Sequence, residues 1–190
     1  MDFSERRLPH LYAIGQPIFV TFRLHGSLPA GREFPKESMT SGEAFVAMDR
    51  LVDTARYGPV YLKQPRVAEL VRSSIRHWGQ ADCDLHAWVI MPNHVHLLFT
   101  PHTNVSSLLC SLKGFSARQV NKLLGSSGQP FWQNESYDRL VRTAEEFRSI
   151  EKYIVNNPVK AGRVASPEQF PWSSGAGVHA CGGSPDPPHV

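Results

Sequence analysis

The chain has 190 residues, of which 41% are hydrophobic, and both values fit a single globular domain. The 20 basic and 17 acidic residues leave a formal net charge of +3, which permits a polyanionic partner without requiring one. The 3 cysteines form no CxxC pair, which argues against a disulfide scaffold or a zinc knuckle and favours a reducing, cytoplasmic location. No segment has the pattern of a signal peptide or of a membrane span, so we expect no membrane partner.

The first half of the chain predicts one strand followed by two helices. Residues 17–24 (PIFVTFRL) are β-branched and aromatic, as in a strand, and the Gly/Pro-rich residues 25–41 predict a loop. Residues 42–57 and 65–78 each place apolar side chains at helical spacing.

The middle of the chain predicts a hairpin and a third helix. Residues 84–91 (DLHAWVIM) and 94–100 (HVHLLFT) are short apolar runs separated by Pro92-Asn93, and two residues are enough for a tight turn. Residues 104–124 predict a helix that ends at the following GSSG segment.

The last predicted helix begins at a capping box. Residues 131–142 show no single pattern, but Thr143 is a good N-cap, with Glu146 three residues later. We expect this helix to end at Asn156 or Asn157, because a proline follows and biases the residue before it away from the helical conformation.

These elements predict an α+β sandwich. Its central sheet should be mostly antiparallel, with helices on one face. From Ser173 onward the chain is rich in Gly, Ser and Pro and should fray. We therefore predict one domain over residues 1–173 and a flexible tail over 174–190.

The segment His94-Val95-His96 carries a candidate metal site. In a strand, residues i and i+2 share a face about 6.6 Å apart, so the two imidazoles point together while Val95, Leu97 and Phe99 face the other side. Two imidazoles leave coordination positions open for substrate oxygens, as a catalytic ion requires. The pattern is short, and two half-exposed polar residues on a strand are the commoner explanation for it.

Tyr153 and Asn157 form the second candidate pair. They are four residues apart, so they share one helix face, at the edge of the apolar stripe. A phenol is a potential nucleophile whose ionised form a nearby cation favours, and Asn157 offers a carbonyl oxygen to that cation. The alternatives are a core-edge aromatic and an ordinary helix-terminal asparagine. Tyr137 is a rival nucleophile in a segment of unclear structure.

Four segments occur in this order: CDLHAWVIMPNHVHLLFTP, LKGFSARQVNKLLG, FWQNESYDRLVR and YIVNNPVKAGRV. Together they resemble the REP-associated tyrosine transposases of the HUH endonuclease superfamily, and the resemblance covers roughly residues 10–173. Those enzymes are related to the small single-tyrosine transposases of insertion sequences. The motifs are specific in combination, although each is weak alone.

The resemblance implies a ferredoxin-like or RRM-like fold with both histidines on a central strand. It implies that His94, His96 and Asn157 hold Mg²⁺ or Mn²⁺, and that Tyr153 attacks a phosphodiester of single-stranded DNA. The product would be a 5′-phosphotyrosine and a free 3′-OH, and reversal would rejoin strands, as in transposition. Family substrates are palindromic REP hairpins, and relatives act as a monomer or a homodimer.

Basic and aromatic residues supply candidate DNA contacts. The basic candidates share the half of the chain that carries the predicted chemistry: Lys113, Arg118, Lys122, Arg139, Arg142, Lys160 and Arg163. Each could equally belong to an ordinary solvated surface. Phe131 and Trp132 could stack on an unpaired base, or could simply belong to the core.

Two other functions compete with a DNA-nicking enzyme. One is a transposase-derived module that binds hairpin DNA without cutting it. The other is a histidine-triad nucleotide hydrolase, which needs a third histidine where this chain has Leu98. The acidic residues are scattered along the sequence and suggest no carboxylate-based transposase.

Overall fold

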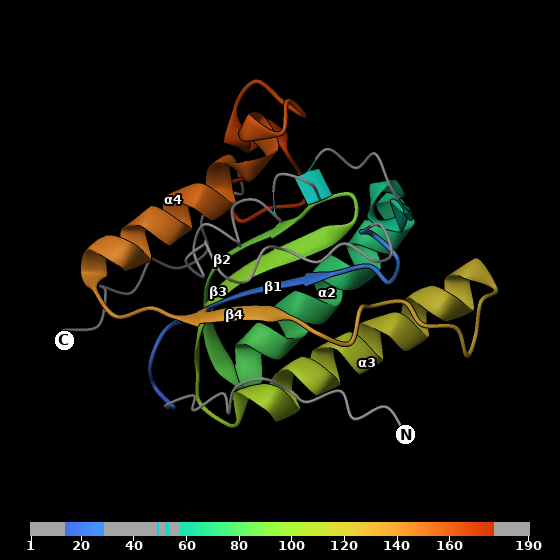
Figure 1. Cartoon of the computed structure of the whole chain (residues 1–190), viewed down its shortest axis with the longest axis horizontal. Coiled ribbons are helices and arrows are strands. Elements are labelled where there is room, and N and C mark those ends of the chain that lie inside the picture. Colours follow the sequence, from blue (N-terminus) through green and yellow to red (C-terminus); the bar gives the residue numbers. More distant parts are fainter. Residues whose placement is uncertain (1–13, 29–48, 50–51, 54–57, 177–190) are drawn as a thin grey trace, which may run out of the picture.

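The computed structural model describes residues 14–28, 49, 52–53 and 58–176 (Figure 1). Its strands are β1 (Ile18–Arg23), β2 (Cys83–Ile90), β3 (His94–Pro101) and β4 (Tyr137–Leu140), and its α-helices are α2 (Pro65–Ala81), α3 (Val105–Leu124) and α4 (Ala144–Lys160). Two 3-10 helices, η1 (Tyr61–Lys63) and η2 (Pro167–Gln169), complete the order. Most of the predicted loop 25–41 and of the predicted helix 42–57 lies outside the described residues. Asp49, Val52 and Asp53, which are described, are helical.

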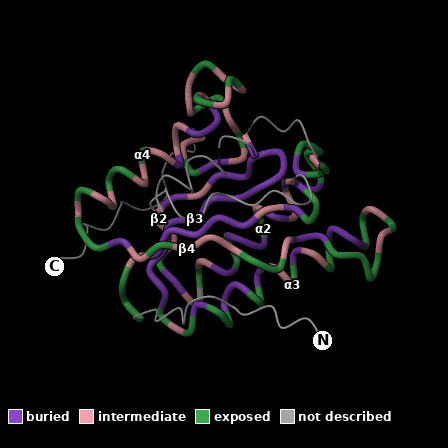
Figure 2. Tube along the Cα trace, viewed as in Figure 1, coloured by how far each residue is buried: buried purple, intermediate pink, exposed green. Residues whose placement is uncertain are grey.

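The four strands form one antiparallel sheet in the order β2-β3-β1-β4. The predicted hairpin between β2 and β3 is confirmed, and its turn is closed by a bond from the Met91 N–H to the His94 carbonyl at 2.8 Å. β3 lies between β2 and β1, and all 8 of its residues are buried (Figure 2). Side chains on either face of β3 are therefore shielded from water.

Side chains of β1 and β3 alternate between two cores. Ile18, Val20, Phe22, Leu97 and Phe99 face a core that α2 and α3 cover. Phe19, Leu98 and Ile154 belong to a second core, between the opposite face and α4. Figure 1 shows α2 and α3 together on one side of the sheet and α4 on the other.

The prediction of an α+β fold with a mostly antiparallel sheet is confirmed. The prediction that helices cover one face describes α2 and α3 but is wrong for α4, which packs on the opposite face. The cause is the double-sided apolar character of β1 and β3, whose odd and even side chains both need cover. As a result, α4 lies over the face of β3 to which His94 and His96 belong.

The predicted N-cap of α4 is confirmed, because the Thr143 side chain accepts a bond from the Glu146 N–H at 3.1 Å. The predicted end of the helix is wrong, since α4 continues through Pro158 to Lys160. Pro158 lies in the last turn, where its missing N–H removes only one helical bond. Asn157 therefore lies inside the helix, and its carbonyl accepts a bond from the Ala161 N–H at 2.9 Å.

The chain stays on the sheet beyond α4. The Ile90 N–H donates to the Trp172 carbonyl, and the Ser174 N–H donates to the Trp88 carbonyl, at 2.8 and 2.9 Å. Ordered structure thus continues past Ser173, where we expected fraying to begin. The predicted tail 174–190 lies mostly outside the described residues and stays a prediction. Among the described helices, none combines the length and apolarity needed to cross a membrane.

Candidate active site

His94 and His96 lie on the α4 side of β3, opposite Arg23 and Thr21 of β1. Both side chains are fully buried, and their Nε2 atoms are 3.1 Å apart. Val95 belongs to the other core, so the predicted division between the two faces is confirmed. The strand thus presents two imidazoles to one point in space.

Hydrogen bonds at the Nδ1 atoms hold both rings. The Nδ1 of His94 is 2.9 Å from Asn93 Oδ1, and the Nδ1 of His96 is 2.7 Å from Thr21 Oγ1. The Asn93 oxygen can only accept, so His94 carries its proton on Nδ1 and keeps the Nε2 lone pair available. This is the tautomer that a metal-ligating histidine needs. Burial, reinforced by His96, lowers the pKa of His94 to about 3, so the ring is neutral at physiological pH.

The carboxyl groups of Asp49 and Asp53, two residues in helical conformation, approach the histidines. Asp49 Oδ1 is 3.2 Å from His96 Nε2 and 3.8 Å from His94 Nε2. Ligand atoms of Asp49, His94 and His96 all lie within 4.8 Å of one another, and all three residues are buried. Asp53 Oδ1 is 3.6 Å from His94 Nε2. Among the described residues, neither Oδ1 atom has a hydrogen-bond partner, so both oxygens could act as ligands to a cation.

The two carboxyl groups differ in their protonation. Burial opposes the ionisation of Asp49, but its close contact with His96, together with the neighbouring His94 and Lys160, outweighs burial and lowers the pKa of Asp49. Burial and the neighbouring Asp49 raise the pKa of Asp53 to about 7. The site therefore holds one ionised carboxylate and a second carboxyl group that is partly protonated near neutral pH.

Tyr153 and Asn157 reach the same face from α4. The Tyr153 ring is 5.7 Å from the His96 ring between centroids, and the Asn157 amide donates to the Tyr153 hydroxyl at 3.5 Å. Asn157 is 1% exposed, and its Oδ1 has no hydrogen-bond partner among the described residues. Phe19 stacks on His96 at 5.7 Å and meets Tyr153 edge-on at 6.3 Å.

Tyr137 also belongs to this cluster. Its ring is 6.3 Å from that of Phe19, the same separation as for Tyr153. However, Tyr153 also contacts the His96 ring and has the Lys160 Nζ 4.8 Å from its centroid. These contacts connect Tyr153 directly to the histidine pair.

The predicted DNA-contacting residues fall into three groups. Arg118, Lys122 and Arg142 are exposed, as such contacts require, and so is Arg139, which pairs with Glu146. Lys160 and Arg163 lie near the histidine site, since their charges lower the pKa of Asp53.

Lys113 forms the third group, because its ammonium group is bonded to the segment before β4. It donates to the carbonyls of Gln133 and Asn134 and to the Ser136 hydroxyl at 2.7 to 3.1 Å. Its geometry argues for an architectural role.

The two predicted stacking residues differ as well. Trp132 is 5% exposed and its indole N–H donates to Ser116 Oγ at 3.0 Å, so it belongs to the core. Phe131 is equally buried, but its ring lines a cleft.

Sequence reasoning missed Asp49 and Asp53. Their spacing of four residues on a predicted helix is a signal, since it places both carboxyl groups on one face. Nothing in the sequence pairs that face with a strand some forty residues later.

Fold and site together define an antiparallel α+β domain with a buried His-His-carboxylate group beside a tyrosine. The model of the family described as "Transposase IS200 like" matches residues 50–157, a range that contains both histidines, Tyr153 and Asn157. This range is more than half of the chain. The chain belongs to the IS200-like transposase family.

Two relatives agree with this assignment. A REP-associated tyrosine transposase of Escherichia coli (strain K12) is 28% identical over 94 residues, which are 48% of this chain and 53% of that protein. The chain thus matches about half of the length of this relative. The solved structure of a REP-associated tyrosine transposase bound to a REP hairpin superposes with a TM-score of 0.60 at 19% identity. The superposition covers 88% of this chain and 81% of the solved chain, and it supports the same fold.

Proposed function

We propose that this protein nicks and rejoins single-stranded DNA through a 5′-phosphotyrosine at Tyr153, acting on hairpins of the REP type as in transposition. The observation that carries the proposal is the convergence of Tyr153 from α4 with the His94-His96 pair of β3. Family membership and the hairpin-bound relative support the choice of substrate.

The donor set fits a divalent cation. The two imidazoles and the Asp49 carboxylate converge on one region, and the Asn157 carboxamide lies beside the Tyr153 hydroxyl. Among the described residues, the Oδ1 atoms of Asp49 and Asn157 lack hydrogen-bond partners. Nitrogen and oxygen donors suit Mn²⁺ as well as Mg²⁺. We infer that His94 and His96 hold the ion with Asn157, Asp49 or both. When bound, such an ion polarises the scissile phosphate and stabilises its developing charge.

The residues of the chain supply the nucleophile and its orientation. Asn157 bonds the Tyr153 hydroxyl, and Phe19 and His96 hold the ring by edge contacts. In the reaction, the phenolic oxygen loses its proton to solvent and forms a bond to phosphorus. The bond from phosphorus to the 3′-oxygen breaks, and that oxygen takes up a proton to leave as a 3′-OH. Attack by a 3′-OH on the phosphotyrosine reverses these steps and joins strands.

We infer that Arg163 assists at the phosphate. Its charge lowers the pKa of the buried His94, and its Nε is buried without a hydrogen-bond partner among the described residues. A guanidinium near the site with an unused N–H donor is suited to hydrogen-bond a phosphate oxygen.

The test is a covalent adduct. Purified protein is incubated with labelled hairpin oligonucleotides and Mn²⁺ and then resolved on a denaturing gel. We expect a protein–DNA band that disappears with EDTA and in Tyr153→Phe. Hairpin binding without an adduct on any oligonucleotide would instead establish a non-cleaving binding module.

A further inference from the structure

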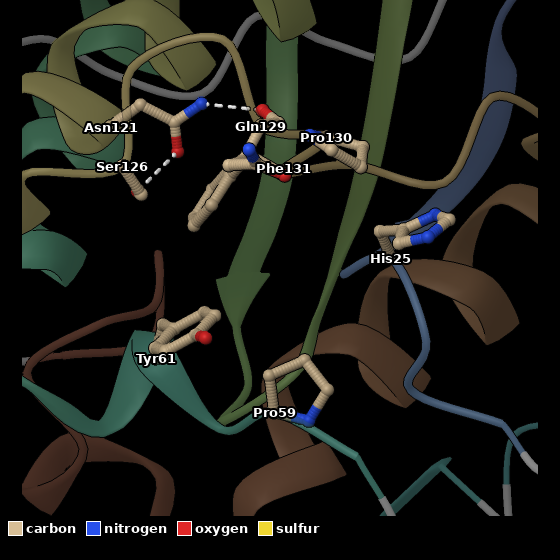
Figure 3. A pocket seen from close by; sticks show the side chains of 8 residues that line it. All are labelled: His25, Pro59, Tyr61, Asn121, Ser126, Gln129, Pro130 and Phe131. Atoms are coloured by element: carbon tan, nitrogen blue, oxygen red, sulfur yellow. Dashed lines mark hydrogen bonds between the residues drawn. The ribbon is translucent and has the colours of Figure 1, made fainter.

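A cleft of about 600 Å³ lies outside the histidine site (Figure 3). Its walls come from the turn after β1, from the segment around η1, from the end of α3 and from the loop that follows α3. They include His25, Tyr61, Asn121 and Phe131. The volume falls within the usual range of small-molecule pockets. None of these residues takes part in the chemistry proposed above.

Two aromatic rings face one another in this cleft. The centroids of Tyr61 and Phe131 are 6.2 Å apart and their planes differ by 22°. Phe131 is 5% exposed and is fixed against Trp132, with ring centroids 4.7 Å apart, whereas Tyr61 is 43% exposed. The pair thus combines a buried inner ring with a partly exposed outer ring. An exposed aromatic face is how proteins bind unpaired bases without strong sequence preference.

A pre-formed polar wall borders the aromatic pair. The Asn121 amide donates to the Gln129 carbonyl at 2.7 Å and accepts from the Ser126 hydroxyl at 3.1 Å. These bonds, drawn in Figure 3, hold the loop after α3 in a fixed shape, and His25 stands across the cleft. Its ring can hydrogen-bond the edge of a base.

Backbone hydrogen bonds connect the cleft to the turn before β3, the strand that carries both histidines. The Leu24 N–H donates to the Asn93 carbonyl at 2.8 Å, and the Leu62 N–H donates to the Pro92 carbonyl at 3.2 Å. The neighbours of His25 and Tyr61 are therefore bonded directly to the turn that precedes His94. The cleft therefore lies at the end of the sheet where β3 begins with His94, the same end as a DNA strand bound at the histidines.

We propose that this cleft binds an unpaired nucleobase of the DNA strand that passes through the site, stacked on Tyr61. This inference rests on the proposed function, since it assumes a single-stranded DNA substrate. Loss of one base–aromatic stack should weaken binding on the order of tenfold.

The test compares variants in DNA binding without cleavage. Affinity for fluorescein-labelled oligothymidine is measured by anisotropy in EDTA, and quenching of an oligonucleotide that carries 2-aminopurine reports stacking. Tyr61→Ala and Tyr61→Leu should each lose about tenfold in affinity and most of the quenching, whereas Tyr61→Phe should keep both. Phe115→Ala is the matched control, because Phe115 is 45% exposed on α3 and does not line the cleft.

The possible failures are distinguishable. If the wild-type protein binds none of these oligonucleotides or any hairpin, the proposed function fails. If it binds and Tyr61→Ala and Tyr61→Leu bind equally well, the cleft is not a base site. An equal loss in Phe115→Ala would also overturn the inference, since it would show a general surface effect. Tyr61→Leu keeps an apolar side chain in the cleft. A loss of DNA affinity in this variant, with an unchanged melting temperature, therefore identifies aromatic stacking as the cause.

Discussion

Asn93 joins the two halves of the candidate ion site. Its Oδ1 accepts a bond from the His94 ring at 2.9 Å, while its Nδ2 donates to the Val52 carbonyl at 3.0 Å. One fully buried amide therefore orients a histidine of β3 and also binds the backbone of Val52, the residue before Asp53. Asn93 thus connects β3 with the residues that carry the two carboxyl groups of the candidate ion site.

Asn93→Ala should weaken metal binding without removing any ligand. Loss of a partner that orients a ligating histidine typically costs about 10- to 100-fold in metal affinity. Loss of the buried bonds should also lower the free energy of unfolding by about 1–3 kcal/mol. Mn²⁺ titration followed by electron paramagnetic resonance and urea unfolding measure the two effects. Asn93→Asp keeps the acceptor for His94, so it should retain more affinity than Asn93→Ala; equal loss in both would contradict the orienting role.

Tyr153→Phe should abolish the covalent adduct and leave hairpin affinity within about twofold, because only the hydroxyl is removed. Tyr137→Phe is the matched control, since both rings lie 6.3 Å from Phe19. It should keep the adduct. Denaturing gels of the two variants settle the assignment, and the opposite pattern would move the nucleophile to Tyr137.

Asp49→Asn should weaken Mn²⁺ binding by at least about tenfold if the carboxylate is a ligand, because the ionised oxygen becomes a neutral amide. Asn157→Ala tests the second candidate oxygen in the same titration. Asp84→Asn is the control, since its side chain is 57% exposed and pairs with His102. If Asp49→Asn binds Mn²⁺ like the control while Asn157→Ala does not, the site is His-His-Asn and Asp49 is not a ligand.

Local patterns predicted most of the elements, because strand alternation and helix capping act over a few residues. The alternation of His94-Val95-His96 and the Thr143 cap are of this kind. The placement of Asp49 and of α4 could not be predicted in this way, because each depends on contacts between distant segments.

Lys113 shows that the contacts of a single side chain are also hard to predict from the sequence. Its charge suggested a phosphate contact, yet it binds carbonyls about twenty residues away. Lys113→Ala should therefore lower the melting temperature. Arg118→Ala should instead leave stability unchanged and reduce the slope of log affinity against log salt by about 0.7 per lost contact with a single strand. Anisotropy titrations across a salt series give the slopes, and a normal melting curve for Lys113→Ala would refute its architectural role.

The buried His94 and Asp53 should give opposing pH dependences in the metal-free protein. Burial lowers the pKa of His94 from 6.5 to about 3, so between these values the unfolded state binds more protons and stability rises with pH. Burial and Asp49 raise the pKa of Asp53 from 3.8 to about 7, so there the folded state binds more protons and stability falls as pH rises. The two slopes oppose each other between about pH 4 and 6.5.

Asp53→Asn removes one of these slopes and should expose the other. In EDTA, the free energy of unfolding of Asp53→Asn should rise more steeply with pH between about 4 and 6.5 than that of the wild type, by up to about 1.4 kcal/mol per pH unit. His94→Gln should make the free energy of unfolding fall with rising pH relative to the wild type, because the Asp53 contribution then remains without the opposing contribution of His94. Urea unfolding at several pH values measures both. Parallel curves for Asp53→Asn and the wild type would mean that Asp53 ionises as readily in the folded as in the unfolded chain, which its burial beside Asp49 argues against.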